Sequence, residues 1–122
     1  MGLVRGKDTR PELTVRRVAH GLGFRFRLHV SRLPGHPDLV FPGRRKVILV
    51  HGCFWHRHRR CKKSTTPKSR VRTWQRKFED NIRRDTKIIS ELRKAGWDTL
   101  VIWECETRRS AKLRSRIRTF LQ

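Results

Sequence analysis

The sequence predicts a single α/β domain over residues 1–122, in which a compact mixed β-sheet is flanked by helices in the order αβββαβα. Three observations support this fold class. Apolar residues recur at helical spacing in three segments, and they alternate or run together as in strands in four others. The chain has the length of one hydrophobic core, and no linker or internal repeat divides it.

The first helix is predicted to follow Thr9. Thr9 and Glu12 have the spacing of a capping box, and Pro11 suits the first helical turn. Gly21 or Gly23 is expected to close the helix in a left-handed conformation. The apolar face comprises Leu13, Val15, Val18, Ala19 and Leu22.

Three strands are predicted next. Residues 24–29 alternate apolar and polar side chains, which is typical of a half-buried strand. Residues 38–41 and 46–50 are apolar runs joined by a Pro-Gly-Arg turn at 42–44, which indicates a β-hairpin.

The second half of the chain is predicted to form two helices around one strand. After an irregular polar stretch at 53–69, a long amphipathic helix ends at Gly96. A buried strand covers 97–103, and a short final helix has Ser110 as its expected N-cap. The long helix carries a stripe composed of Trp74, Phe78, Ile82, Asp85, Ile89 and Leu92.

The charge of the chain favours nucleic acid as its partner. Lys and Arg number 32 against 10 Asp and Glu, which gives a net charge of +22. Arginine dominates this excess and pairs well with phosphate. No run approaches the roughly 20 apolar residues of a membrane span, and no signal peptide is recognisable, so we expect no membrane association. Three cysteines, two of them beside histidines, favour a reduced cytoplasmic protein over a disulfide scaffold.

Asp38 and two histidines are candidates for phosphodiester chemistry. Asp38 begins a strand and could hold Mg²⁺, although a carboxylate after proline could equally cap a turn. His51 and His56 flank the loop that follows the next strand, and histidine carries protons near neutral pH.

A second set of residues has the composition of a zinc site. Cys53, His58, Cys61 and Cys105 could bind zinc tetrahedrally and order a polar loop. Cys105 could instead be a small buried apolar residue. His56 and His58 are alternatives for the proton and zinc roles, because spacing alone does not separate them.

Asp85 and three aromatic residues complete the candidates. A bare carboxylate in an apolar stripe needs a partner, either an active-site histidine or one of the arginines. Phe54 and Trp55 are adjacent and cannot both face one core, so at least one is a candidate wedge between DNA bases. Trp74 could join them, with core packing as the alternative.

The motifs PGHPDLVF, VHGCFWHRHRRC, NIRRD and GWDTLVIWEC, in this order, resemble those of the very short patch repair (Vsr) endonucleases. The resemblance runs from about residue 5 to residue 106. It implies a restriction-endonuclease-like fold with a structural zinc loop. It also implies an enzyme that nicks DNA beside the thymine of a T:G mismatch left by deamination of 5-methylcytosine.

The resemblance also implies roles for individual residues. Asp38 and the main-chain carbonyl of Val50 would bind catalytic Mg²⁺, and His56 would transfer protons with support from His51 and Asp85. Glu12 would be an active-site acid, which competes with its role in the capping box. The implied structural Zn²⁺ ligands are Cys53, His58, Cys61 and Cys105, and the implied DNA-inserting residues are Phe54, Trp55 and Trp74.

The expected substrate is double-stranded DNA with a T:G mismatch, and the expected protein is a bacterial, cytoplasmic monomer that associates with the nucleoid when bound to DNA. Mismatch-repair proteins are candidate partners. Compared with familiar members, the loop from 53 to 61 is one residue longer, and we expect most of the N-terminal arm of longer members to be absent. The alternatives are a sequence-directed or loosely specific nickase with little mismatch preference, and a non-catalytic zinc module that binds nucleic acid.

Overall fold

The computed structural model describes residues 9–28, 30–53, 56–58, 61 and 67–122. In this part of the chain the strands form one mixed sheet in the order β1-β2-β3-β4. The strands are β1 (Arg27–Leu28), β2 (Leu39–Phe41), β3 (Lys46–His51) and β4 (Asp98–Trp103), and the helices are α1 (Arg10–Gly21), α2 (Val71–Lys94) and α3 (Ser110–Leu121). The predicted α/β fold and its element order are confirmed.

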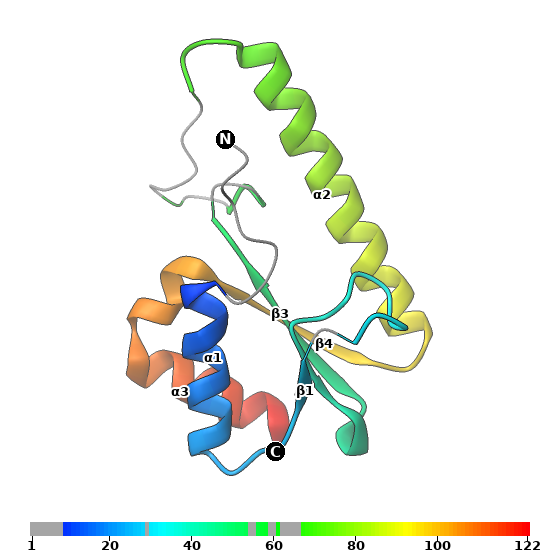
Figure 1. The fold of residues 1–122 in the computed structure, drawn as a ribbon, viewed down its shortest axis with the longest axis vertical. Helices are drawn as coiled ribbons and strands as arrows, with labels where there is room; N and C mark the ends of the chain where they lie inside the picture. The colour runs from blue at the N-terminus through cyan, green and yellow to red at the C-terminus, as the bar shows by residue number, and fades with distance from the viewer. Residues whose placement is uncertain (1–8, 29, 54–55, 59–60, 62–66) are drawn as a thin grey trace.

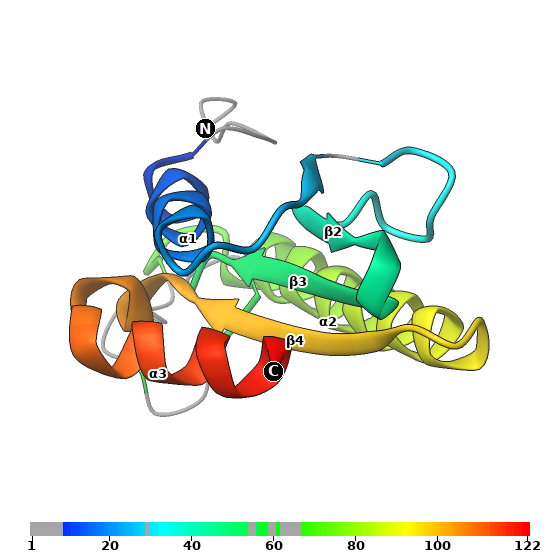
Figure 2. The same cartoon turned by 90° about the horizontal axis from the view of Figure 1, so that it is seen from below.

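The sheet separates two apolar layers because successive strand residues point to opposite faces. One face packs on α1 and α3, and the other packs on α2. Figure 2 shows α3 in front of β4 and α2 behind it. The first layer is built around Val15, Ala19, Leu39, Phe41, Ile48, Ile102, Leu113, Ile117 and Leu121, and the second around Val40, Val47, Leu49 and Leu92.

The register between β3 and β4 aligns the C-terminal ends of the two strands. These strands are parallel, and their last residues, His51 and Trp103, are cross-strand partners. Each strand leads directly into a segment with a cysteine, Cys53 after β3 and Cys105 after β4. The parallel pairing therefore brings residues about fifty positions apart in the sequence to the same edge.

The first helix begins as predicted. The Thr9 side chain accepts a hydrogen bond from the Glu12 amide at 3.4 Å, and Pro11 lies in the first turn. The helix ends at Gly21, and Gly23 rather than Gly21 takes the left-handed conformation, with φ of 89°. The predicted helical end near Gly96 is also confirmed, since Gly96 follows α2 with φ of 89°.

Several predicted boundaries are wrong. Only Arg27 and Leu28 of the predicted strand 24–29 pair with β2, and residue 29 lies outside the described residues. Because β2 has only three residues, it offers few partners for ladder bonds. The predicted strand at 97–103 begins one residue later, at Asp98. Ser110 is the first residue of α3 rather than its N-cap, and the preceding Arg109 makes no side-chain cap hydrogen bond.

The apolar stripe of α2 is only partly buried. Phe78 and Leu92 are buried, but Ile82 is 46% exposed and does not belong to the core. The N-terminal half of α2 extends beyond the sheet, so it lacks the sheet face that covers the C-terminal half (Figure 1). In the described part of the chain, no helix combines the length and the apolar character needed to cross a bilayer.

Candidate active site and metal centre

Asp38 connects the start of β2 to the end of β3. Its Oδ2 accepts a hydrogen bond from the Val50 amide at 2.6 Å. Burial raises the pKa of Asp38 to about 7; the Val50 amide opposes this shift, and the adjacent Glu12 carboxyl reinforces it. Two carboxyl groups thus lie together next to the Val50 backbone. Such a pair repels when both are ionised, and a bound cation would relieve this repulsion.

Glu12 reaches this position from the first turn of α1. It is only 4% exposed, and its Oε2 accepts a hydrogen bond from Arg16 Nη2 at 3.3 Å. The Thr9 half of the predicted capping box is observed, since the Glu12 amide donates to Thr9, while the Glu12 carboxyl contacts Arg16 and faces Asp38. Sequence reasoning missed Arg16, although its place one helical turn after Glu12 could have signalled an ion pair.

His56 is held by a carboxylate from the other side of the site. The Nδ1 atom of His56 lies 2.6 Å from Oδ2 of Asp85, which projects from α2. A carboxylate at this distance accepts the Nδ1 proton, so Nε2 is left as the nitrogen that can take up or release a proton. Asp85 was predicted to pair with either an active-site histidine or an arginine, and the structure pairs it with His56.

His51, the last residue of β3, stacks on His56. The ring centroids are 4.0 Å apart and the rings are 7° from parallel. Burial and, to a smaller extent, the neighbouring His56 lower the pKa of His51 to about 4, against an opposing effect of Asp85. His51 is therefore uncharged at neutral pH.

The stacked geometry favours proton transfer over metal binding at these three residues. The nitrogen lone pairs of an imidazole lie in the plane of its ring. Because the His51 and His56 rings are stacked and nearly parallel, their lone pairs lie in separate planes, and one ion cannot be in both. Ligand atoms of His51, His56 and Asp85 do lie within 4.8 Å of one another, but a shared ion would require the rings to turn.

The four predicted zinc ligands come together at the ends of β3 and β4. The ligand atoms of Cys53, His58, Cys61 and Cys105 all lie within 4.8 Å of one another. The Nδ1 atom of His58 is 3.6 Å from Cys53 Sγ and 3.4 Å from Cys105 Sγ. A tetrahedral zinc ion with usual Zn–S and Zn–N bonds would separate such atoms by about 3.6 Å. The donor set therefore fits zinc.

The surroundings of the thiols also fit a metal ion. Burial raises the pKa of Cys53 to about 12, and burial likewise raises the pKa of Cys105. Without a cation these crowded thiols keep their protons, whereas zinc would hold them as thiolates. The Cys105 amide already donates to Cys53 Sγ at 3.4 Å, and the Cys53 amide donates to Glu104 Oε1 at 3.4 Å.

A tight turn after β3 separates the two histidines that spacing alone could not distinguish. The amides of His56 and His58 donate to the carbonyls of Gly52 and Cys53, and Arg57 between them has φ of 53°. As a result, His56 contacts Asp85 and His58 contacts the cysteines. The extra residue noted in this loop does not prevent Cys61 from joining the cluster.

Trp103 is a site residue that the sequence did not reveal. It was predicted only as part of a buried strand, yet its ring stacks on His58 with centroids 4.3 Å apart and an interplanar angle of 9°. It also meets His51 edge to face at 5.3 Å and 80°. The sequence signal that could have identified Trp103 is its position directly before Glu104 and the predicted zinc ligand Cys105.

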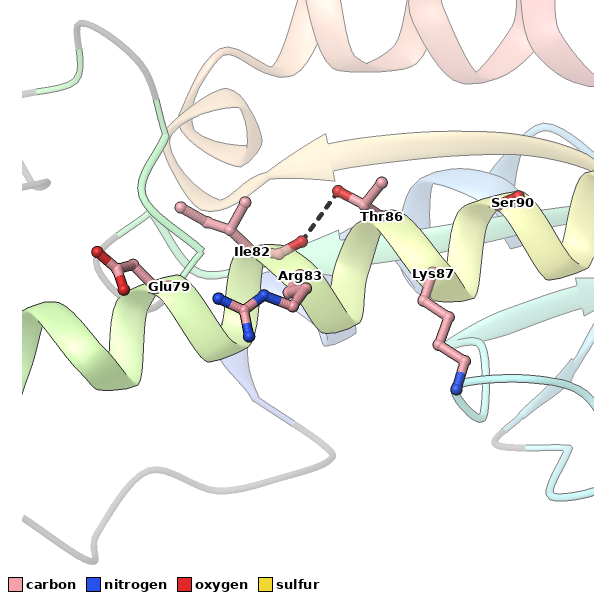
Figure 3. Close-up of a pocket in the computed structure, with 6 residues that line it drawn as sticks. All are labelled: Glu79, Ile82, Arg83, Thr86, Lys87 and Ser90. Carbon is pink, nitrogen blue, oxygen red and sulfur yellow. Dashed lines mark hydrogen bonds between the residues drawn. The ribbon is translucent and has the colours of Figure 1, made fainter.

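The predicted DNA-inserting residues are only partly described. Phe54 and Trp55 lie outside the described residues. Trp74 is half-buried on α2 and stacks on Phe78 at 5.8 Å, and Arg57 lies 4.0 Å over the Phe78 ring. Farther along α2 there is an open hollow that contains none of the predicted site residues (Figure 3). It is lined by Glu79, Ile82, Arg83, Thr86, Lys87 and Ser90.

Comparisons with known proteins identify the family of the chain. The family model described as DNA mismatch endonuclease Vsr matches residues 1–63. The type II nicking enzyme V.XorIIP of Xanthomonas oryzae pv. oryzae is 48% identical over 121 residues, which cover 99% of this chain and 88% of the relative. The type II nicking enzyme V.NmeAIP of Neisseria meningitidis is 40% identical over 114 residues, covering 93% and 81%. The DNA mismatch endonuclease Vsr of Escherichia coli is 39% identical over 113 residues, covering 93% and 72%. The chain belongs to the Vsr family of DNA mismatch endonucleases.

Proposed function

We propose that the chain is a Mg²⁺-dependent, zinc-stabilised endonuclease that nicks one strand of duplex DNA beside the thymine of a T:G mismatch. Its family makes it a DNA nicking hydrolase, and the mismatch and the metals are the proposed part. The observation that carries the proposal is the carboxyl pair of Asp38 and Glu12 at the amide of Val50. The next residue, His51, stacks on His56, which Asp85 orients.

The carboxyl pair is the proposed magnesium site. Carboxylate and backbone carbonyl oxygens are ligands that Mg²⁺ accepts, and Asp38, Glu12 and the Val50 carbonyl would supply them. When bound, Mg²⁺ would stabilise the negative charge that develops on the scissile phosphate and would activate a water molecule. Arg16 partly neutralises the pair through Glu12, which limits the repulsion before the metal binds.

The histidine pair is the proposed proton carrier. Asp85 fixes the His56 ring so that Nε2 can exchange a proton with the attacking water or the leaving oxygen. The uncharged His51 ring holds His56 from one side without adding a second positive charge. The four-ligand cluster would bind structural Zn²⁺ and fix the loop that carries His56 and His58.

DNA binding is proposed to use charge and stacking. The net charge of +22 supplies phosphate contacts that should weaken as salt rises. Phe54, Trp55 and Trp74 are proposed to insert between base steps next to the mismatch, because aromatic wedges unstack and bend DNA. Phe54 and Trp55 directly precede His56 in the sequence, and Trp74 lies in α2, the helix that carries Asp85, which supports this role.

The test is incubation of the purified protein with end-labelled T:G and T:A duplexes of otherwise identical sequence, with and without Mg²⁺. The expected result is one nick beside the mismatched thymine that requires Mg²⁺. Absence of any Mg²⁺-dependent strand scission would contradict the proposal and favour the non-catalytic module.

A sequence-directed or loosely specific nickase is the second candidate. It is favoured by the names of two relatives, which are called type II nicking enzymes rather than mismatch endonucleases. In that case the T:A and T:G duplexes would be nicked at equal rates.

A further inference from the structure

The candidate active site and the zinc cluster are joined by a continuous series of aromatic rings. From one end to the other it consists of His56, His51, Trp103 and His58. Its outer members are held at both ends, His56 by the Asp85 carboxylate and His58 by the thiols of Cys53 and Cys105. Trp103 is the member that is neither a predicted zinc ligand nor a predicted proton carrier.

We propose that Trp103 is a positioning residue, which holds the His51–His56 pair in its reactive orientation and takes its own orientation from His58 in the metal cluster. This inference rests on the proposed function and names a residue through which the metal cluster would affect cleavage. In this role Trp103 itself touches neither substrate nor metal.

The contacts support the proposal because each ring restricts the next. Near-parallel stacking of His58 on Trp103 fixes the plane of the indole. The indole meets His51 at 80°, so a rotation of either ring would create a clash or a gap. His51 is 7% exposed and therefore has little room to move independently. A change in the orientation of the Trp103 ring would therefore alter the position of His56 through His51.

The parallel register explains why Trp103 lies beside His51. His51 and Trp103 are cross-strand partners at the ends of β3 and β4, so their side chains point to the same face of the sheet. The amide of Trp103 donates to Glu106 Oε1 at 2.9 Å, which fixes the backbone as β4 ends. Both the backbone and the ring are consequently restrained.

The experiment compares Trp103→Leu and Trp103→Phe with the matched control Trp97→Leu. Trp97 directly precedes the start of β4, whereas Trp103 is its last residue, and Trp97 packs in the α2 layer, where it stacks under Arg45. Both leucine variants remove a half-buried indole from the same strand region. Only the Trp103 variants should disturb the histidines.

Three quantities are measured for each variant: the single-turnover nicking rate at saturating protein, the Kd for T:G duplex, and the zinc content. For Trp103→Leu we expect a rate loss of about 10- to 100-fold, with Kd within about twofold and zinc retained. Trp103→Phe should recover part of the rate, and Trp97→Leu should match the unmodified protein. An unchanged rate in Trp103→Leu, an equal loss in Trp97→Leu, or loss of zinc from Trp103→Leu would overturn the proposal.

Imidazole signals of His51 and His56 in NMR spectra provide a readout that does not depend on cleavage. They should shift in Trp103→Phe and after removal of zinc by a chelator, but not in Trp97→Leu. If the unmodified protein failed to nick T:G duplex, the proposed function would fail while these shifts would still test the ring contacts. Unchanged histidine signals in Trp103→Phe and in the chelated protein would overturn the positioning role.

Discussion

Replacement of Asp38 by asparagine should abolish nicking and yet make the metal-free protein more stable at alkaline pH. The amide has nearly the shape of the carboxyl and can still accept the Val50 hydrogen bond. It cannot supply the negative oxygen that Mg²⁺ requires, so we expect nicking to fall at least about 100-fold. The Kd for DNA should change little, because the substitution removes no positive charge.

The stability gain follows from the raised pKa of Asp38. Burial holds this pKa at about 7, against an ordinary value of 3.8, so the folded protein binds the proton more tightly than the unfolded chain. The resulting stabilisation is complete below pH 3.8 and is lost as pH rises through 7. At pH 8 the ionised carboxylate would cost up to about 4 kcal/mol, an upper limit that solvent relaxation reduces to about 1–2 kcal/mol.

The assay is thermal unfolding without Mg²⁺ at pH 4 and pH 8. Asp38→Asn should raise Tm by about 3–8 °C at pH 8 and leave it nearly unchanged at pH 4. Adding Mg²⁺ should stabilise the unmodified protein and not the variant. Asp98→Asn, at an exposed carboxylate at the start of β4, is the control and should alter neither stability nor nicking. A lower Tm for Asp38→Asn at pH 8, or retained nicking, would refute the reasoning.

Further predictions concern other parts of the molecule. Cys105→Ser should lose about one equivalent of zinc in metal analysis of the purified protein, and an unchanged metal content would remove Cys105 from the site. Asp85→Asn should free the His56 ring and slow single-turnover nicking about 10- to 100-fold with Kd within about twofold, so an unchanged rate would show that the 2.6 Å contact has no catalytic role. With Mg²⁺ kept low, the nicking rate should rise with pH through about 7 as Asp38 ionises, and a rate that falls over this range would contradict its assignment as the metal ligand. Arg45→Ala should lower the free energy of unfolding in urea by about 1–2 kcal/mol without affecting nicking, because Arg45 donates to the last turn of α2 at Ala95 O and stacks on Trp97.

The helices were predictable from the sequence because their signals are local. Thr9, Pro11 and Glu12 mark the start of α1 within four residues, and the predicted cap is observed. Ile82 shows the limit of this reasoning. Its spacing on α2 is that of a core residue, but burial depends on whether another element covers that turn, and Ile82 is left 46% exposed.

Several residues of the candidate site were predictable from the sequence, whereas Arg16, Trp103 and the geometry of the site were not. Cysteine and histidine content indicated a cluster that could hold a metal ion, and the unfavourable burial of a bare carboxylate indicated a partner for Asp85. Whether His56 or His58 joins the cysteines depends on the backbone turn at Arg57, which residue spacing does not encode. The contact between Trp103 and His51 depends on the register of two parallel strands that are distant in sequence.

The position of the Glu12 carboxyl could not be predicted either, because it depends on how α1 packs against the sheet. A capping residue and an active-site acid are usually alternatives when only the sequence is read. The described structure places the amide of Glu12 at the helix start and its carboxyl at Asp38, because α1 packs over the face of the sheet where β2 begins.

The proposed function is tested most directly by the rate of single-strand nicking of a T:G duplex relative to its T:A counterpart, measured with and without Mg²⁺. We expect a single nick beside the mismatched thymine, dependent on Mg²⁺ and much slower on the T:A duplex. Equal rates on both duplexes would contradict mismatch recognition, and equal rates with and without Mg²⁺ would contradict the role assigned to Asp38 and Glu12.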